Sequence, residues 1–231
     1  MNSQDGFLTI KGLLKQNEIS CIEKIVQSAN FIDGSSTSTD AARLVKNNLQ
    51  LPKIANAEKQ ELDAIILGAI SDSPIVQATL MPIKILPTII SKYEPGMHYG
   101  AHVDSPIMGD PQIGVLRTDV AMTLFLSDPK SYEGGELVVY TTSGEMKFKL
   151  EKGDAIIYPT TYVHEVRPVT SGIRIVAVTW MQCTVRNGDQ RNLLLQLKTV
   201  QSLIERSNPL SSENLILLQI YSNLLRMWSE I

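Results

Sequence analysis

The pattern of apolar and polar positions changes twice along the chain, and its first part predicts both strand and helix. Residues 7–14, "FLTIKGLL", are typical of a short strand. In "NEISCIEKIVQSAN", residues 17–30, isoleucine and valine recur at the spacing of one helical face, which predicts a helix beginning at Asn17 or a neighbour. A second helix is expected over residues 56–70, "NAEKQELDAIILGAI".

From Ile83 to Trp180 the pattern is that of β-strands. The segment "IKILPTIISKYEPG" is rich in β-branched residues and interrupted by prolines, which indicates strand and turn. Further strand-like runs follow, separated by turn clusters such as "SDPKSYEGG" and "RPVTSG". These runs are "DVAMTLFLS", "GELVVYTT", "EMKFKLEK", "DAIIYPT" and "IRIVAVTW". Many short strands at close spacing predict a sandwich or barrel rather than a parallel sheet.

The last part of the chain is helical again. Residues 190–206 and 211–228 each repeat large apolar residues at the spacing of a helical face. Pro209 separates the two predicted helices, and Ser211 or Ser212 provides an N-cap for the second.

The second helix of this tail has large apolar residues on more than one face. Residues 217 and 218 are both leucine, and so are residues 224 and 225, although a single buried stripe would need only one of each pair. The tail could pack on the outside of the β region. The density of apolar residues instead favours a homodimer that the C-terminal helices hold together in part.

The composition is that of an ordinary globular protein. Hydrophobic residues make up 43% of the chain and charged residues 19%, and the net charge is -3. Because nucleic acids and anionic membranes both require a basic face, neither is expected as the main partner. We expect a cytoplasmic protein, since no signal-peptide pattern and no bilayer-spanning apolar run occurs. Cys21 and Cys183 are expected to be reduced and largely buried.

Two of the three histidines lie in the short segment "HYGAHVD". The glycines in and before this segment disfavour a helix, so we expect a strand. On a strand, His102 and Asp104 point to the same face roughly 6.6 Å apart and can bind one ion. His98 lies roughly 13 Å from His102 along such a strand, so we assign it no role in the site.

The third histidine, His164, follows a different predicted strand in "YPTTYVHEVRPV". Two histidines and one carboxylate form the facial triad of non-haem Fe(II) oxygenases, which leaves three positions on the metal open. His102, Asp104 and His164 are therefore the candidate metal ligands. A His-x-Asp tripeptide alone is weak evidence, so other residues have to support this assignment.

Arg174 gives that support, ten residues after His164 in the apolar run "IRIVAVTW". Because "RPVTSG" between them is typical of a turn, we expect Arg174 on the strand beside that of His164. It shares strand parity with Val176, Val178 and Trp180, which are expected to point inward. A buried guanidinium needs a partner, and a dicarboxylate cosubstrate provides one. The alternative is an exposed arginine on the outer face of an edge strand.

Together these segments resemble the Fe(II)/2-oxoglutarate oxygenases of the prolyl 4-hydroxylase superfamily, and more closely its PKHD-type hydroxylase branch. The resemblance rests on "YEPGMHYGAHVD", "GGELVVY", "GDAIIYPTTYVHEVRPVTSGIRIVAVTW" and the helical tail. It implies a mostly β fold with flanking helices (α+β), whose core is a double-stranded β-helix, or jelly roll. Residues 1–80 would support the jelly-roll core of residues 81–185, and residues 186–231 would form a C-terminal helical extension.

The resemblance also implies roles for individual residues. It makes His102, Asp104 and His164 the iron ligands. It assigns Arg174 to the 5-carboxylate of 2-oxoglutarate, and Tyr93 resembles the tyrosine that contacts the same molecule. The alternative for Tyr93 is a packed strand residue.

Tyr99 and Trp180 resemble residues on the substrate side of the iron, and either could instead belong to the core. The segment "SPIMGDPQIGVLRTD" resembles a lid and replaces the asparagine-alanine that usually follows His-x-Asp in this branch. We expect that difference to bear on the choice of substrate.

The implied reaction is a hydroxylation that uses Fe(II), 2-oxoglutarate and O2 and releases succinate and CO2, with L-ascorbate (vitamin C) as reductant. The substrate is either a protein or peptide, such as peptidyl proline, or a small molecule linked to siderophores or iron uptake. A third interpretation is a non-catalytic module of cupin type that binds metal or oxoglutarate. The complete ligand set and Arg174 disfavour it.

Overall fold

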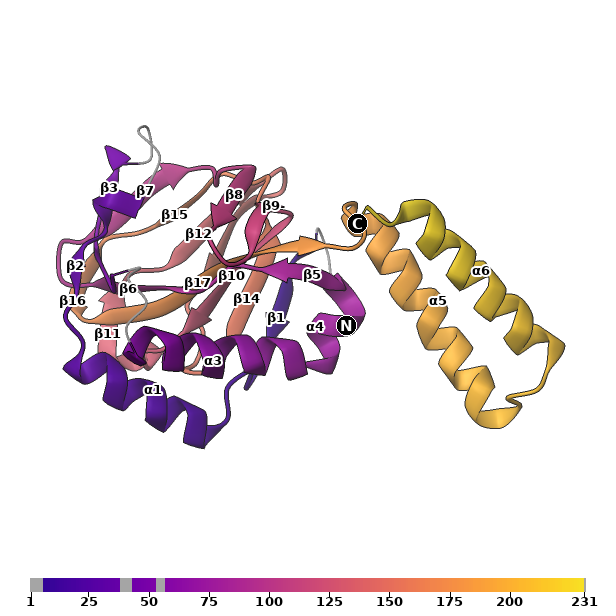
Figure 1. Ribbon diagram of the computed structural model, residues 1–231. Helices are drawn as coiled ribbons and strands as arrows, with labels where there is room; N and C mark the ends of the chain where they lie inside the picture. The colour runs from indigo at the N-terminus through magenta and orange to yellow at the C-terminus, as the bar shows by residue number, and fades with distance from the viewer. Residues whose placement is uncertain (1–5, 38–42, 53–56, 231) are drawn as a thin grey trace.

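The computed structural model describes residues 6–37, 43–52 and 57–230, and two large β-sheets form its centre (Figure 1). The larger sheet has the strand order β1-β14-β10-β17-β6-β4-β2, and β5 also pairs with β17. Its strands are β1 (Leu8–Ile10), β2 (Ile32–Asp33), β4 (Leu49–Gln50), β5 (Pro82–Ile85), β6 (Ile89–Tyr93), β10 (Val120–Phe125), β14 (Ala155–Pro159) and β17 (Arg174–Cys183).

The second large sheet has the order β13-β12-β15-β7-β3. Its strands are β3 (Lys46–Asn47), β7 (His98–His102), β12 (Leu137–Thr141), β13 (Gly144–Phe148) and β15 (His164–Val166). Two further pairs complete the described strands: β8 (Ile107–Asp110) with β9 (Gly114–Arg117), and β11 (Tyr132–Gly134) with β16 (Val169–Gly172).

Helices cover the outer face of the larger sheet (Figure 1). They are α1 (Gln16–Ser28), α3 (Ala57–Asp72) and α4 (Pro74–Leu80). In α3, Leu62, Ile66 and Ile70 are fully buried at helical spacing, and they belong to one apolar cluster with Met122 and Leu124 of β10. The helices therefore support the sheet from behind.

The inner face of the same sheet packs against the second sheet. Alternate residues of β10 point this way, and Ala121 and Phe125 join Leu137 and Val139 of β12 in a second apolar cluster. Every residue of β10 is buried because helices cover one of its faces and the opposite sheet covers the other. Two facing antiparallel sheets of this kind form a jelly roll, as predicted.

The C-terminal segment forms a hairpin of two helices, α5 (Gly188–Ser207) and α6 (Ser212–Trp228), that projects away from the jelly roll (Figure 1). A buried hydrogen bond of 3.0 Å from Gln201 to Asn214 joins the helices. At the base of the hairpin, an ion pair of 2.6 Å between Arg117 and Glu230 fixes its end to the β8–β9 hairpin. Ser211 caps α6, as expected.

The segment "SPIMGDPQIGVLRTD" is largely a strand hairpin, β8–β9. Two other expectations from the sequence were wrong. Part of "RPVTSG" is strand β16, which pairs with β11, rather than only a turn. Cys21 is exposed on α1, whereas Cys183 is buried as predicted.

Among the described residues, no helix is both long enough and apolar enough to cross a membrane.

Candidate metal centre

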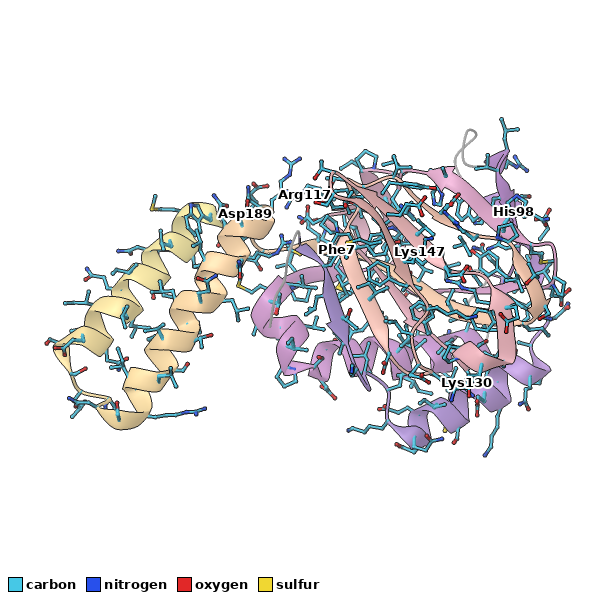
Figure 2. All side chains as sticks on the ribbon, turned by 180° about the vertical axis from the view of Figure 1, so that it is seen from behind. Phe7, His98, Arg117, Lys130, Lys147 and Asp189 are labelled. Carbon is cyan, nitrogen blue, oxygen red and sulfur yellow. The ribbon has the colours of Figure 1, made fainter. Side chains whose placement is uncertain are left out.

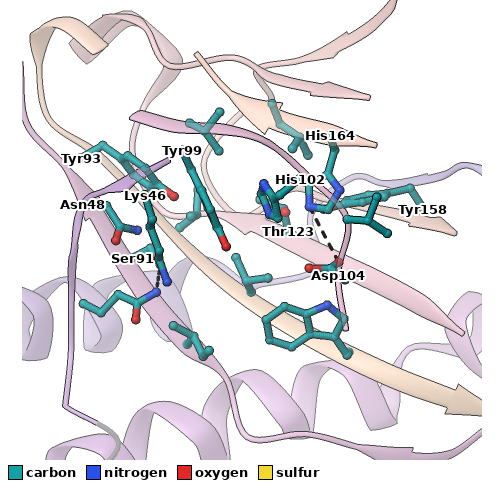
Figure 3. Close-up of a pocket in the computed structure, with 18 of the residues that line it drawn as sticks. Lys46, Asn48, Ser91, Tyr93, Tyr99, His102, Asp104, Thr123, Tyr158 and His164 are labelled. Carbon is teal, nitrogen blue, oxygen red and sulfur yellow. Dashed lines mark hydrogen bonds and ion pairs between the residues drawn. The ribbon is translucent and has the colours of Figure 1, made fainter. Parts of the chain in front are cut away.

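The register of two neighbouring strands brings the two candidate histidines together. His102 is the last residue of β7, His164 is the first residue of β15, and the two are directly opposite one another in the antiparallel pair. Asp104 lies two residues beyond the end of β7, where the chain turns toward the same point (Figure 3). The predicted strand thus stops before the aspartate.

The three side chains are close enough to bind one ion. Their potential ligand atoms all lie within 4.8 Å of one another, and Nε2 of His164 is 3.8 Å from Oδ2 of Asp104. Oδ2 of Asp104 is buried and has no hydrogen-bond partner among the described residues. Because a buried unpartnered carboxylate oxygen is costly, this atom fits a metal ligand.

Backbone carbonyls fix the orientation of both imidazole rings. Nδ1 of His102 donates to the carbonyl of Gly100 at 2.8 Å, and Nδ1 of His164 donates to that of Tyr162 at 3.2 Å. Since a carbonyl only accepts, each Nδ1 carries the proton and each Nε2 keeps its lone pair for a metal. Burial, together with the adjacent His164, lowers the pKa of His102 to about 3, so this ring is neutral at physiological pH.

Arg174 lies across the interior from the triad, which corrects its predicted place. It is the first residue of β17 in the larger sheet, whose neighbours are β10, β6 and β5, and it is paired in register with Tyr93 of β6. The strand of His164 belongs to the other sheet. Arg174 is therefore not beside His164 in one sheet, yet both line the same pocket.

The guanidinium of Arg174 is buried, and two of its nitrogens lack a hydrogen-bond partner among the described residues. The residue is 1% exposed, and Nε and Nη1 have no hydrogen-bond partner within the described chain. Its guanidinium carbon lies 5.0 Å from the centre of the Tyr93 ring and 5.7 Å from that of Phe125. A carboxylate in this pocket could accept a charge-assisted hydrogen bond from this guanidinium, so the residue fits a dicarboxylate ligand.

The backbone leaves space for this arginine. Gly135 has a φ of +67°, and a Cβ atom there would lie 2.9 Å from Cδ of Arg174. Only glycine suits both the conformation and the close approach. The second glycine of "GGELVVY" thus has a direct role in placing Arg174.

The three aromatic candidates also line the pocket. Tyr93 is buried, and this burial raises the pKa of its phenol. The ring of Tyr99 stacks on that of His102 with centroids 3.7 Å apart. Trp180 has a buried Nε1 without a hydrogen-bond partner among the described residues, which leaves a donor available inside the pocket. By contrast, His98 does not line the pocket, as expected.

The sequence did not point to several polar residues of the pocket. Asn48, Gln50 and Ser91 line it, and Figure 3 shows Asn48 beside Tyr93. Nε2 of Gln50 donates to Oγ of Ser91 at 3.1 Å. Both amide atoms of Asn48 are buried and unpartnered among the described residues. Asn48 and Gln50 lie between and in strands of two residues, which are too short to show a pattern. Ser91 lies in the five-residue β6, two positions before Tyr93, so strand parity could have indicated it.

Two family models match the chain. Residues 88–182 match the 2OG-Fe(II) oxygenase superfamily, and residues 189–230 match the PKHD-type hydroxylase C-terminal domain. The first match contains every candidate site residue. The second coincides with the α5–α6 hairpin.

Curated relatives match over nearly their whole length. A PKHD-type hydroxylase of Crocosphaera subtropica is 38% identical over 223 residues, which are 96% of this chain and 99% of the relative. One of Xylella fastidiosa strain M12 is 40% identical over 228 residues, again 96% of this chain and 99% of the relative.

Solved structures show the same fold at low sequence identity. The viral collagen prolyl hydroxylase of Paramecium Bursaria Chlorella virus-1 is 19% identical with a TM-score of 0.53, over 78% of this chain and 97% of the viral protein. HygX of Streptomyces hygroscopicus is 15% identical with a TM-score of 0.55, over 78% and 84% of the two chains.

The geometry predicts that removal of one candidate ligand strongly weakens metal binding. In His102→Ala, affinity for Fe(II) should fall more than about a hundredfold, because one of three protein ligands is lost. Anaerobic titration calorimetry with Fe(II) measures the effect. His98→Ala is the matched control and should bind iron as the wild type does. Full iron occupancy in His102→Ala or in Asp104→Ala would contradict the assignment.

Proposed function

The chain belongs to the PKHD-type hydroxylases of the 2OG-Fe(II) oxygenase superfamily, and on this basis we propose that His102, Asp104 and His164 bind its Fe(II). The enzyme is an Fe(II)- and 2-oxoglutarate-dependent dioxygenase. We propose that it hydroxylates its substrate and releases succinate and CO2. When bound, Fe(II) supplies the three open positions at which 2-oxoglutarate and O2 react.

One observation carries this proposal: the buried, underpartnered Arg174 lines the same pocket as the triad. The distal carboxylate of 2-oxoglutarate would accept charge-assisted hydrogen bonds from this guanidinium, and the other end of the molecule would then face the proposed metal ligands. Tyr93, directly opposite Arg174 in register, would hold the cosubstrate from the side. These contacts orient the cosubstrate before reaction.

The remaining aromatic residues would serve the substrate side. Tyr99 stacks on His102 and restrains that ring, while Trp180 lies on β17 on the same strand face as Arg174. Together with the apolar pocket wall, they would exclude water from the reacting centre. We propose L-ascorbate as the reductant and the cytoplasm as the location.

There are two candidate substrate classes: a peptide or protein, and a small molecule. Structural relatives include both types, since one is a collagen prolyl hydroxylase and HygX was solved with hygromycin B bound. At such low identity these likenesses support the fold alone. The second candidate is favoured by a groove beside the metal centre, of about 710 Å³, that is within the size range of small-molecule sites.

We also propose that the chain forms a homodimer through its C-terminal hairpin. Leu193 and Val200 of α5 form one exposed stripe, and Ile216, Ile220 and Met227 of α6 form another. These side chains are between 43% and 74% exposed, although a two-helix hairpin is marginally stable by itself. A second copy of the chain would cover such surfaces.

The reaction is tested by succinate formation from 2-oxoglutarate with Fe(II) under air. The enzyme should form succinate slowly alone and faster with its substrate, so proline-containing peptides and ferric siderophores are added in parallel. Substrate hydroxylation is measured by a mass increase of one oxygen atom. The Asp104→Ala protein is the control. Absence of any succinate above that control, with iron and 2-oxoglutarate bound, would contradict the proposal.

The dimer is tested by sedimentation velocity of the full chain at tens of micromolar. The wild type should sediment as a dimer and Ile220→Glu as a monomer, because a charge in an apolar interface is strongly unfavourable. Gln219→Glu adds the same charge at a neighbouring exposed position and should remain dimeric. A monomeric wild type would refute the proposal.

A further inference from the structure

A groove of about 710 Å³ lies where the C-terminal hairpin meets the jelly roll. Residues between 186 and 192, at the start of α5, form one wall, and Arg117 and Tyr162 belong to the jelly-roll side. Figure 2 shows Arg117 and Asp189 at this junction. The groove is therefore formed jointly by the two parts of the chain.

This groove adjoins the pocket of the metal centre. Val103 and Asp104 line both cavities, and Asp104 is one of the proposed iron ligands. The groove is therefore next to the place where a substrate would lie beside the triad. The groove is too large to serve only as a passage for O2, and its volume is typical of a small-molecule site.

One of the three arginines in the groove is already neutralised. Nε and Nη2 of Arg117 donate to the two carboxylate oxygens of Asp119 at 2.6 and 3.0 Å. Nη1 donates to Glu230 at 2.6 Å. Arg117 thus holds the hairpin in place, and its charge is not available to a ligand.

The other two arginines have no acidic partner within the described chain. Arg191 is 6% exposed, and its Nη1 donates only to the carbonyls of Val185 and Arg186, at 2.8 and 2.7 Å. Those bonds fix the guanidinium at the groove wall but leave its charge uncompensated. Arg186 itself is exposed and lines the same wall. A buried cation without a counter-charge is costly, which favours an anionic ligand.

The two arginines without an acidic partner face a single lining carboxylate. The acidic residues that line the groove are Asp104, Asp119 and Asp189. The first would bind the metal. The second is paired with Arg117, as is Glu230, which does not line the groove. Among the lining residues, Asp189 is then the one acid set against Arg186 and Arg191, and the N-terminal end of α5 adds a partial positive charge.

We propose that this groove binds the part of the substrate remote from the oxidised carbon, and that this part carries a carboxylate or phosphate group paired with Arg186 and Arg191. The proposal rests on the proposed function, which places the reacting carbon at the triad. It gives the C-terminal extension a role in substrate selection. Substrates without an anionic group at this distance would bind weakly.

The test uses the full chain loaded with Zn(II) and 2-oxoglutarate, so that no turnover occurs and the cosubstrate site is filled. Fluorine NMR measures the binding of para-trifluoromethylbenzoate, para-trifluoromethylphenylphosphonate and the neutral para-trifluoromethylbenzyl alcohol. At least one anionic probe should bind more tightly than the alcohol. Arg186→Gln and Arg191→Gln should each raise its dissociation constant about tenfold, as expected for a lost charge-assisted hydrogen bond.

Arg206→Gln is the matched control, because it removes the same charge near the far end of α5 and should leave binding unchanged. If Arg191→Gln fails to fold, the exposed Arg186 carries the test alone. Equal binding of the anionic and neutral probes, or no loss in Arg186→Gln, would overturn the proposal. Metal and 2-oxoglutarate content are measured on the same samples, so a failure of the proposed function appears there and not in the probe titration.

Discussion

The buried charge of Arg174 is the constraint on which the site depends. A guanidinium at 1% exposure with two unpartnered nitrogens is unfavourable in an apolar interior unless a ligand completes it. The surrounding residues accommodate the group, since Tyr93 and Phe125 flank it and Gly135 leaves it space. The jelly roll thus holds a buried cation in a fixed position, which is a form of preorganisation for the acidic cosubstrate that we propose it binds.

Strand pairing places the Arg174 cation opposite the proposed metal ligands. The pairing of β7 with β15 puts His102 directly across from His164, and two backbone carbonyls orient their rings. Arg174 comes from the facing sheet, so the pocket between the sheets has the proposed metal ligands on one wall and a cation on the other. Helices pack against the outer face of the larger sheet and bury its apolar side chains.

The sequence predicted the chemistry better than it predicted the topology. Strand parity and the scarcity of histidine selected the three residues whose ligand atoms converge. Strand parity also predicted that Arg174, Val176 and Val178 point inward, and all three line the pocket.

The position of Arg174 relative to His164 was predicted wrongly, for a physical reason. A turn-like segment such as "RPVTSG" shows that the chain reverses, but not that it crosses to the opposite sheet through a short strand paired with β11. Asn48 was missed because it lies between two strands of two residues each, in which no alternation can be recognised. Ser91 shares strand parity with Tyr93 in β6, so that parity could have indicated it.

The affinity of the metal-loaded protein for 2-oxoglutarate, measured in wild type and in Arg174→Ala, tests the central claim most directly. Loss of this buried charge-assisted pair should cost about 3–5 kcal/mol, or about two to four decades in the dissociation constant. Iron binding should persist in Arg174→Ala. Arg167→Ala is the control, because it removes a more exposed arginine directly after β15, and it should bind 2-oxoglutarate as the wild type does. Unchanged 2-oxoglutarate affinity in an Arg174→Ala protein that still binds iron would contradict the account.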